Sequence, residues 1–203
     1  MLRNFATRFL LAAVLGIAAA SAAPAHAEEF VITPGGASRV VFTSKAPVES
    51  FEGKTSRLQG RLTLDPADIG DSVTVRLEVD LASLDTGIAK RNQHMRENHL
   101  ETAKYPTAVF TGASVIGPKG ARLESGKPLT FECEGTFTLH GVTRRLRSTT
   151  EVTLGDLGGK KQLRFRSTFV VSLAEYAISR PQFLFLKLAD QQDLKVTGVA
   201  VAR

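Results

Sequence analysis

The sequence predicts an all-β protein: a closed barrel of about eight antiparallel strands with one amphipathic helix inserted at about residues 88–100. From Phe30 onward, apolar and polar residues alternate in runs separated by turn residues, a pattern typical of a barrel or a two-sheet sandwich. Only between Ser83 and Phe110 does the period become helical. A barrel is favoured because the strands are long for a sandwich, and a sandwich has less use for a helix capping its end.

Residues 1–27 are expected to be a signal peptide that is not part of the fold. Arg3 and Arg8 flank a short charged start, an apolar run extends from Phe9 to Ala20, and Ala25-His26-Ala27 has the small-x-small form of a cleavage site. The apolar run is too short to span a membrane. Cleavage after Ala27 would leave a single periplasmic domain, residues 28–203.

The predicted strands follow one another with few interruptions. They begin at Phe30 and Val40–Phe42 and continue with Leu58–Leu64, Val73–Leu81, Val109–Ile116, Leu129–Leu139, Val142–Leu154, Leu163–Leu173 and Leu194–Val201. His140-Gly141 and Gly158-Gly159 are typical of tight hairpin turns. In the apolar stretch Ser179–Leu188 the alternation shifts, so this stretch is either a buried strand or, as slightly favoured, a loop that leans into the barrel mouth.

The predicted helix has a defined start, end and face. Asp85-Thr86-Gly87 forms a turn before it, and Tyr105-Pro106 ends it because the residue before a proline prefers extended geometry. One face carries Ile88, Asn92, Met95 and His99, which recur at i, i+4, i+7 and i+11.

Composition excludes some classes of partner and chemistry. Without the predicted signal peptide the chain has 24 basic and 20 acidic residues, a net charge of +4. This diffuse excess, with no tryptophan and two tyrosines, does not indicate nucleic-acid binding. The single cysteine, Cys133, rules out an intramolecular disulfide, and its place on the apolar side of a strand indicates a small buried side chain.

A hollow barrel would need small residues on its inward face. Gly60, Gly112, Gly135, Gly198 and Ser167 fall at apolar positions of their strands, where they either leave room for a ligand or relieve strand curvature. The residues expected to contact an apolar tail are Phe42, Leu62, Val75, Leu77, Phe110, Phe131, Phe137, Phe169, Val171, Phe183 and Phe185.

The helix carries the side chains that would meet a polar head group at the mouth. Arg91 and His94 can donate to a carbonyl or phosphate oxygen, and Asn92 and Met95 complete the set. The alternative is a solvated helix face, with Asn92 and His99 in structural hydrogen bonds.

Enzyme chemistry is not indicated. His94 and His99 are five residues apart, so on a helix they diverge by roughly 140° and do not form the paired zinc face of an HExxH site. No G-x-S-x-G nucleophile motif is present. Neither a catalytic site nor a metal or other cofactor is predicted.

Four sequence pieces resemble the YceI-like family of exported isoprenoid-binding proteins: LDTG at 84–87, RNQHMR at 91–96, YPTAVF at 105–110 and TLHGVT at 138–143. The resemblance implies a lipocalin-like barrel whose apolar tunnel holds a polyprenyl chain, as in an isoprenoid quinone or polyprenyl phosphate, or in other members a fatty-acid amide. Asn92 and His99-Leu100 depart from the family pattern, which often has Asp and two Phe there.

The functional prediction is a periplasmic carrier that sequesters an isoprenoid or other long-chain lipid, with no nucleic-acid partner. The alternatives are a packed barrel that binds a protein partner and has no small ligand, or a binder of fatty-acid amides. A homodimer, and transient contact with the membrane surface or a membrane quinone protein, stay open.

Overall fold

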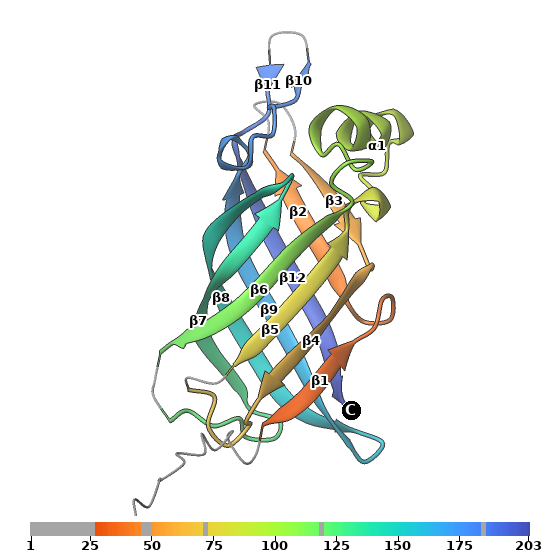
Figure 1. The fold of residues 1–203 in the computed structure, drawn as a ribbon. Helices are drawn as coiled ribbons and strands as arrows, with labels where there is room; N and C mark the ends of the chain where they lie inside the picture. The colour runs from red at the N-terminus through yellow and green to blue at the C-terminus, as the bar shows by residue number, and fades with distance from the viewer. Residues whose placement is uncertain (1–26, 46–49, 71–72, 118–119, 184–185) are drawn as a thin grey trace, which may run out of the picture.

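The computed structural model describes residues 27–45, 50–70, 73–117, 120–183 and 186–203. Ten strands build the main sheet (Figure 1): β1 (Glu28–Ile32), β2 (Arg39–Ser44), β3 (Phe51–Thr55), β4 (Leu58–Leu64), β5 (Thr74–Asp80), β6 (Thr107–Ile116), β7 (Pro128–Leu139), β8 (Val142–Leu157), β9 (Lys160–Ser172) and β12 (Gln191–Ala202). The helix α1 (Ala89–His94) lies between β5 and β6, and a single π-helical turn, Met95–His99, extends it. Short 3₁₀ turns cover Leu81–Ser83 and Ala174–Tyr176.

The sheet closes into a barrel with eight antiparallel strand positions. Ten strands fill them because two of the positions are each occupied by two short strands. Its order is β1-β4-β5-β6-β7-β8-β9-β12-β2-β3, and β1 also pairs with β12. β1 and β2 lie one after the other along β12, since Phe30 pairs with Ala202 and Phe42 with Leu194. β4 and β3 pair with β1 and β2 in the same way. The predicted closed barrel is therefore confirmed.

Alternation sets which side chains face the interior. Along β9, Leu163, Phe165 and Val171 are buried while Arg164 and Arg166 are exposed. Successive side chains of a strand point to opposite faces, so one face of β9 lies in the core and the other faces outward. The predicted His140-Gly141 turn is also present: both residues have positive φ, at 52° and 76°, as in the tight turns that suit the twist of a hairpin.

The helix falls within a residue of its predicted range, and its predicted face is present except at Ile88. Asn92, Met95 and His99 are half-buried, whereas the side chains between them are mostly exposed. Ile88, in extended geometry before the first turn, is 52% exposed, and no residue of α1 is buried. Met95 makes packing contacts with the barrel, as does Leu100 after the π turn.

The stretch Ser179–Leu188 is not a barrel strand. Gln182–Phe183 (β10) and Leu186–Lys187 (β11) pair only with each other, in a two-stranded sheet. This hairpin stands at the same end of the barrel as α1, here called the upper end (Figure 1). Of the two alternatives for this stretch, the structure therefore excludes a barrel strand, and the favoured one, a loop that leans into the barrel mouth, stays a prediction. The short strand β3, Phe51–Thr55, was not predicted at all.

The buried apolar residues form two clusters stacked along the barrel. The lower cluster includes Phe30, Ile32, Leu58, Leu64, Val152, Leu163, Phe165 and Val196. The upper cluster lies beneath the helix and contains Leu81, Leu84, Ala108, Phe137, Leu139, Leu146, Val171, Tyr176 and Ile178. Within the described ranges, no helix is long and apolar enough to cross a membrane.

Candidate ligand-binding cavity

An apolar cavity lies inside the lower part of the barrel. Its volume is about 90 Å³, counted as the space open to the centre of a water molecule. It is lined by Leu62, Leu64, Ile69, Val73, Val75, Leu77, Phe110, Leu123, Phe131, Cys133, Leu146, Ser148, Thr150, Val152, Leu163, Phe165, Ser167, Phe169 and Val196. One water needs roughly 10–15 Å³ measured in this way, so the cavity has room for roughly seven groups of that size.

Two segments close the cavity at the lower end. The backbone N–H of Ile69 donates to the carbonyl of Ala121 at 2.9 Å, and that of Leu123 donates to Pro66 at 2.8 Å. These bonds dock residues 65–70 against residues 120–127 and hold the buried Ile69 and Leu123 side chains in the cavity wall. The lower end is therefore a packed floor.

An aromatic layer separates the cavity from the helix. The rings of Phe137 and Phe169 lie edge to face with centroids 5.9 Å apart, and Phe137 meets Tyr176 in the same manner at 5.7 Å. Phe169 belongs to the cavity wall, whereas Phe137 and Tyr176 are buried in the upper cluster. Edge-to-face pairs of this kind add about 0.5–1.5 kcal/mol beyond area burial. A long ligand would have to displace these rings.

The tail-binding residues predicted from the sequence fall into three groups. Six line the cavity: Leu62, Val75, Leu77, Phe110, Phe131 and Phe169. Phe137, Val171 and Phe42 lie above it in or against the upper cluster. Phe185 lies outside the described residues, as does the side chain of Phe183 in β10. The tail-contact role of the eleven stays a prediction.

The inward glycines do not hollow out the barrel. A Cβ on Gly135 would come within 2.5 Å of the Phe110 ring, and one on Gly198 within 2.5 Å of the Phe165 ring. Each glycine therefore makes room for an aromatic side chain of the same protein, so the cavity-making interpretation is wrong for these two. Gly112 has a φ of +69° at an irregularity in the β6–β7 register, which agrees with the strand-curvature interpretation.

Two of the four residues predicted for a head group are hydrogen-bonded within the protein. Arg91 donates from Nε to Thr86 Oγ1 at 2.9 Å, donates to the Thr86 carbonyl at 2.6 Å, and stacks 4.0 Å above the centroid of the Phe51 ring. Asn92 Oδ1 accepts from the Thr86 N–H and hydroxyl, and its amide donates to Asp85. These bonds fasten the start of the helix to the turn before it.

The other two members of that set differ in exposure. His94 is exposed, and Met95 packs partly buried against the upper cluster. The hydrogen bonds of Gly87 N–H and of Asn92 to the Asp85 carboxylate lower the pKa of Asp85. Head-group contact by Arg91, Asn92, His94 and Met95 stays a prediction.

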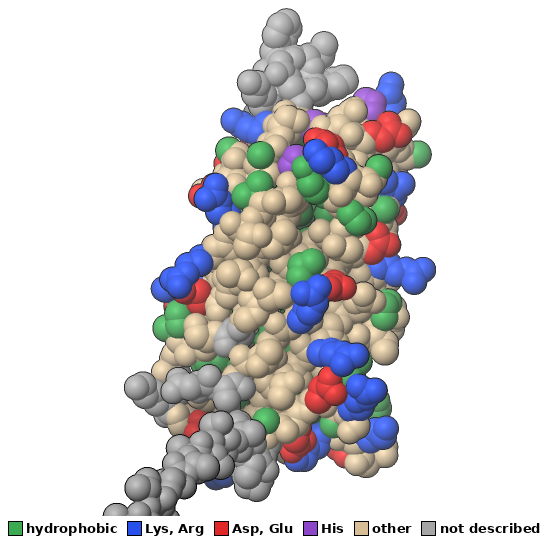
Figure 2. Space-filling view, viewed as in Figure 1, with side chains coloured by type: hydrophobic (Ala, Val, Ile, Leu, Met, Phe, Trp, Pro, Cys, Tyr) green, Lys and Arg blue, Asp and Glu red, His purple; other side chains and the backbone are tan. Residues whose placement is uncertain are grey.

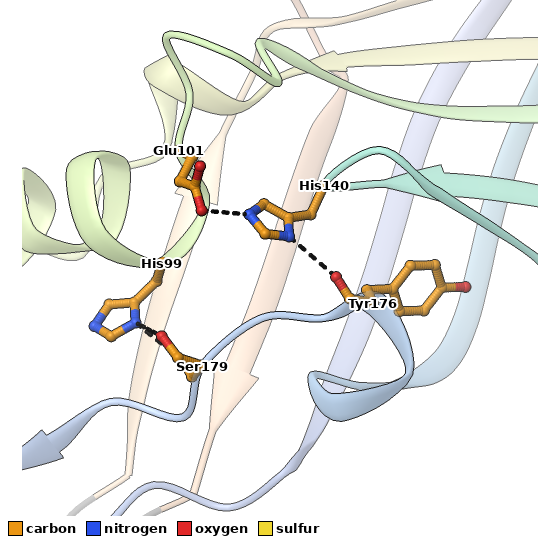
Figure 3. Close-up of polar contacts among 5 residues, drawn as sticks. All are labelled: His99, Glu101, His140, Tyr176 and Ser179. Carbon is orange, nitrogen blue, oxygen red and sulfur yellow. Dashed lines mark hydrogen bonds and ion pairs between the residues drawn. The ribbon is translucent and has the colours of Figure 1, made fainter.

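Two histidines tie the end of the helical segment to the chain after β9 (Figure 3). The buried His140 has Nε2 3.1 Å from Glu101 Oε1 and Nδ1 3.1 Å from the Tyr176 carbonyl, and its ring packs on Tyr105. His99 Nδ1 lies 3.0 Å from the Ser179 carbonyl. Desolvation lowers the pKa of His99, with a smaller effect from His94, while the bond to Ser179 opposes it. Residues 89–101 and 174–179, here called the upper cover, are thus joined to each other by His99 of the π turn and by His140 of the β7–β8 turn.

The cavity wall also contains a polar row, of which only Ser167 was predicted to face inward. Ser148, Thr150 and Ser167 face inward beside Cys133, on the adjacent strands β7, β8 and β9. Burial raises the pKa of the Cys133 thiol to about 11. Ser148 and Thr150 have the same strand parity as the buried Leu146 and Val152, so alternation places them inward, but it does not show that they line a cavity.

The outer face is a mixed charged surface. Arg147 pairs with Glu132 and Glu134, and Arg76 with Glu78. Figure 2 shows basic and acidic side chains interspersed over the face that carries β4, β5 and β6, with hydrophobic side chains in small groups. Among the described residues, no group of three or more His, Cys, Asp or Glu is placed to hold a metal ion.

Comparison with known proteins agrees with this architecture. The family model of the YceI-like domain matches residues 30–200. A UPF0312 protein of Vibrio cholerae is 30% identical over 171 residues, covering 81% of this chain and 86% of the relative. One from Shewanella denitrificans is 28% identical over 172 residues, covering 77% and 90%.

Solved structures share the fold at lower identity. A polyisoprenoid binding domain from Saccharophagus degradans, described as implicated in plant cell wall breakdown, superposes with a TM-score of 0.64 at 20% identity, covering 87% of this chain and 99% of that one. BcnA of Burkholderia cenocepacia gives 0.62 at 19% identity, covering 80% and 95%. The family model spans nearly the whole described barrel, and the chain therefore belongs to the YceI-like family.

Proposed function

We propose that this protein binds the apolar chain of a lipid, such as an isoprenoid quinone or a polyprenyl phosphate, inside the barrel and carries or sequesters it. The observation that carries this proposal is the cavity itself, whose wall consists of fifteen apolar side chains, a thiol and three hydroxyls. The Saccharophagus protein of the same fold is described as a polyisoprenoid binding domain, which supports the same class of ligand.

Burial of the tail would supply the affinity. Each CH₂ group removed from water contributes about 0.8 kcal/mol, so a segment of five groups gives about 4 kcal/mol before the losses that accompany binding. A cavity volume of about 90 Å³ is too small to hold a chain of several isoprene units. Binding of such a chain would therefore require the rings of Phe137, Phe169 and Tyr176 to rotate toward the helix.

The role proposed is binding without catalysis. His99 lies against a backbone carbonyl and a serine hydroxyl, and His140 against a backbone carbonyl and a carboxylate that hold the upper cover in place. Neither histidine is among the residues that line the cavity. The proposal also includes export, with a signal peptide cleaved after Ala27 and a mature domain of residues 28–203 in the periplasm. N-terminal sequencing of the protein from a periplasmic extract tests this part.

Native mass spectrometry of the purified mature protein, followed by organic extraction, tests the binding. The expected result is a bound species of mass matching a long-chain lipid that extraction releases. If the protein is isolated empty, it should take up decylubiquinone, a quinone with a short apolar tail. A protein that is lipid-free and also fails to take up this probe would refute the proposal.

A further inference from the structure

The wall of the cavity contains a row of four side chains with polar or sulfur atoms, and it crosses three neighbouring strands. Cys133 on β7 lies opposite Ser148 on β8, and Thr150 on β8 lies opposite Ser167 on β9. All four residues line the cavity. Across the cavity, β4 and β5 contribute only aliphatic side chains to the wall, namely Leu62, Leu64, Val75 and Leu77.

The three hydroxyls form a hydrogen-bonded chain with an open end. Thr150 Oγ1 lies 2.7 Å from Ser167 Oγ and 3.3 Å from Ser148 Oγ. Ser148 Oγ is 3.5 Å from the Cys133 carbonyl, at the outer limit for such a bond. Each hydroxyl has one hydrogen to donate and two lone pairs to accept with. The two shorter contacts use two of the three hydrogens.

The third hydrogen can take either of two positions, because a hydroxyl rotates. If the chain is directed toward Cys133, the hydrogen goes to that distant carbonyl and lone pairs of Ser167 face the cavity. If the chain is reversed, Ser167 directs its hydrogen into the cavity. In both cases the row offers a hydrogen-bonding partner to a group inside an otherwise apolar space.

The wall does not suit a charged group. No lysine, arginine or histidine is among the nineteen residues that line the cavity. An ionised phosphate placed there would lose its hydration without a cation to pair with, which is strongly unfavourable. A neutral carbonyl, amide or hydroxyl would lose only a few hydrogen bonds to water and would regain one from the hydroxyl row.

We infer that Ser148, Thr150 and Ser167 form a subsite for a neutral oxygen-bearing group of the ligand, which is bound inside the barrel and not at the mouth. The inference rests on the proposed lipid-binding function and narrows its ligand class to uncharged amphiphiles, such as a long-chain ketone, quinone, amide or alcohol. It also orients the ligand, because the oxygen-bearing end must enter before the remainder of the chain.

Two probes that differ in one oxygen test the subsite: 2-tridecanone and tridecane, both delivered from cyclodextrin and measured by displacement of a bound fluorescent lipid. One buried hydrogen bond corresponds to about a threefold to tenfold difference in affinity. Because the ketone also loses its hydration on binding, the informative quantity is the ratio of ketone affinity to tridecane affinity, compared between the wild-type protein and its variants. Ser167→Ala and Thr150→Val should each lower this ratio by that factor while the affinity for tridecane stays unchanged.

Thr149→Val is the matched control, since this exposed residue neighbours Thr150 on the outer side of β8. It should keep the ketone preference. Ser167→Ala leaves the Thr150–Ser148 contact in place, so the test still holds if Thr150→Val fails to fold.

A ratio of ketone to tridecane affinity that is the same in the wild-type protein, Ser167→Ala and Thr150→Val would overturn the inference while leaving the proposed function intact. So would a ketone preference that survives Thr150→Val and Ser167→Ala but is lost in His94→Ala, since the oxygen would then lie at the mouth. Failure of both probes to bind would instead count against the proposed lipid-binding function.

Discussion

Filling the cavity tests whether the barrel is hollow enough to hold a guest. Val75 on β5 is buried, pairs with Leu62 of β4 and lines the cavity wall. In Val75→Phe the added ring would occupy cavity space. In a hollow barrel the extra carbons gain burial at about 0.8 kcal/mol per CH₂, so the free energy of unfolding of the ligand-free protein should stay equal or rise. In a packed interior, overfilling would lower it by about 1–3 kcal/mol.

The same substitution should abolish most lipid binding. If the ring takes the place of about four CH₂ groups of a tail, the lost burial costs about 3 kcal/mol of binding free energy. This loss raises the dissociation constant about a hundredfold. Displacement of a fluorescent lipid measures affinity. Urea unfolding followed by circular dichroism measures stability, since the chain has no tryptophan to report on it.

Val170→Phe provides a matched control, because Val170 lies on the outer face of β9 and is 50% exposed. This variant should bind lipid as the wild-type protein does. The reasoning would be refuted if Val75→Phe kept wild-type affinity. Destabilisation of ligand-free Val75→Phe by more than about 1 kcal/mol would instead favour the packed-barrel alternative.

Three further predictions follow from the wall, the aromatic layer and the upper cover. With a pKa of about 11, only about one Cys133 thiol in a thousand is ionised at pH 8, so iodoacetamide should modify it slowly. Bound lipid should slow the reaction further, and equal rates by mass spectrometry with and without lipid would exclude Cys133 from the ligand site. Phe137→Ala should cost about 3–5 kcal/mol in urea unfolding yet speed lipid exchange, because it removes a ring of the layer above the cavity; unchanged exchange would mean that this layer is no barrier. The pKa of His99 is lowered in the folded state, so its contribution to stability is present above about pH 6.5, the unfolded value, and is lost as the pH falls through the folded pKa. Between pH 7.5 and 5.5 the free energy of unfolding of His99→Gln should therefore fall by less than that of the wild-type protein. An equal fall in the two proteins, measured by urea unfolding, would contradict this.

The barrel could be predicted from the sequence because alternation is unambiguous where the two faces differ in polarity. β9 illustrates this, with Leu163 and Phe165 inward and Arg164 and Arg166 outward. The helical segment ends at His99, close to the expected residue 100, but the backbone turns at Glu101, with a φ of 44°, and not at Tyr105-Pro106. Its face was predictable except at Ile88, whereas the π turn at Met95–His99 was not, because a sequence pattern does not encode such a turn.

The site was less predictable than the fold, for two physical reasons. The floor depends on Ile69 and Leu123, which come from connecting segments far apart in the sequence, so no local pattern shows that they meet. The inward direction of Ser148 and Thr150 follows from alternation, but a sequence pattern does not show that their hydroxyls lie at a cavity. Gly135 and Gly198 could be read from the sequence as leaving space for a ligand, but a phenylalanine from the neighbouring strand fills the space beside each glycine.

Among the described residues, the docked segments at Ile69 and Leu123 bound the lower end of the cavity, so a ligand that enters past the aromatic layer would have to leave by the same end. The part of such a ligand that enters first would then leave last. Release would then depend on whatever draws the trailing end outward. Such a protein should transfer its ligand readily only to a partner that binds the exposed end of the lipid.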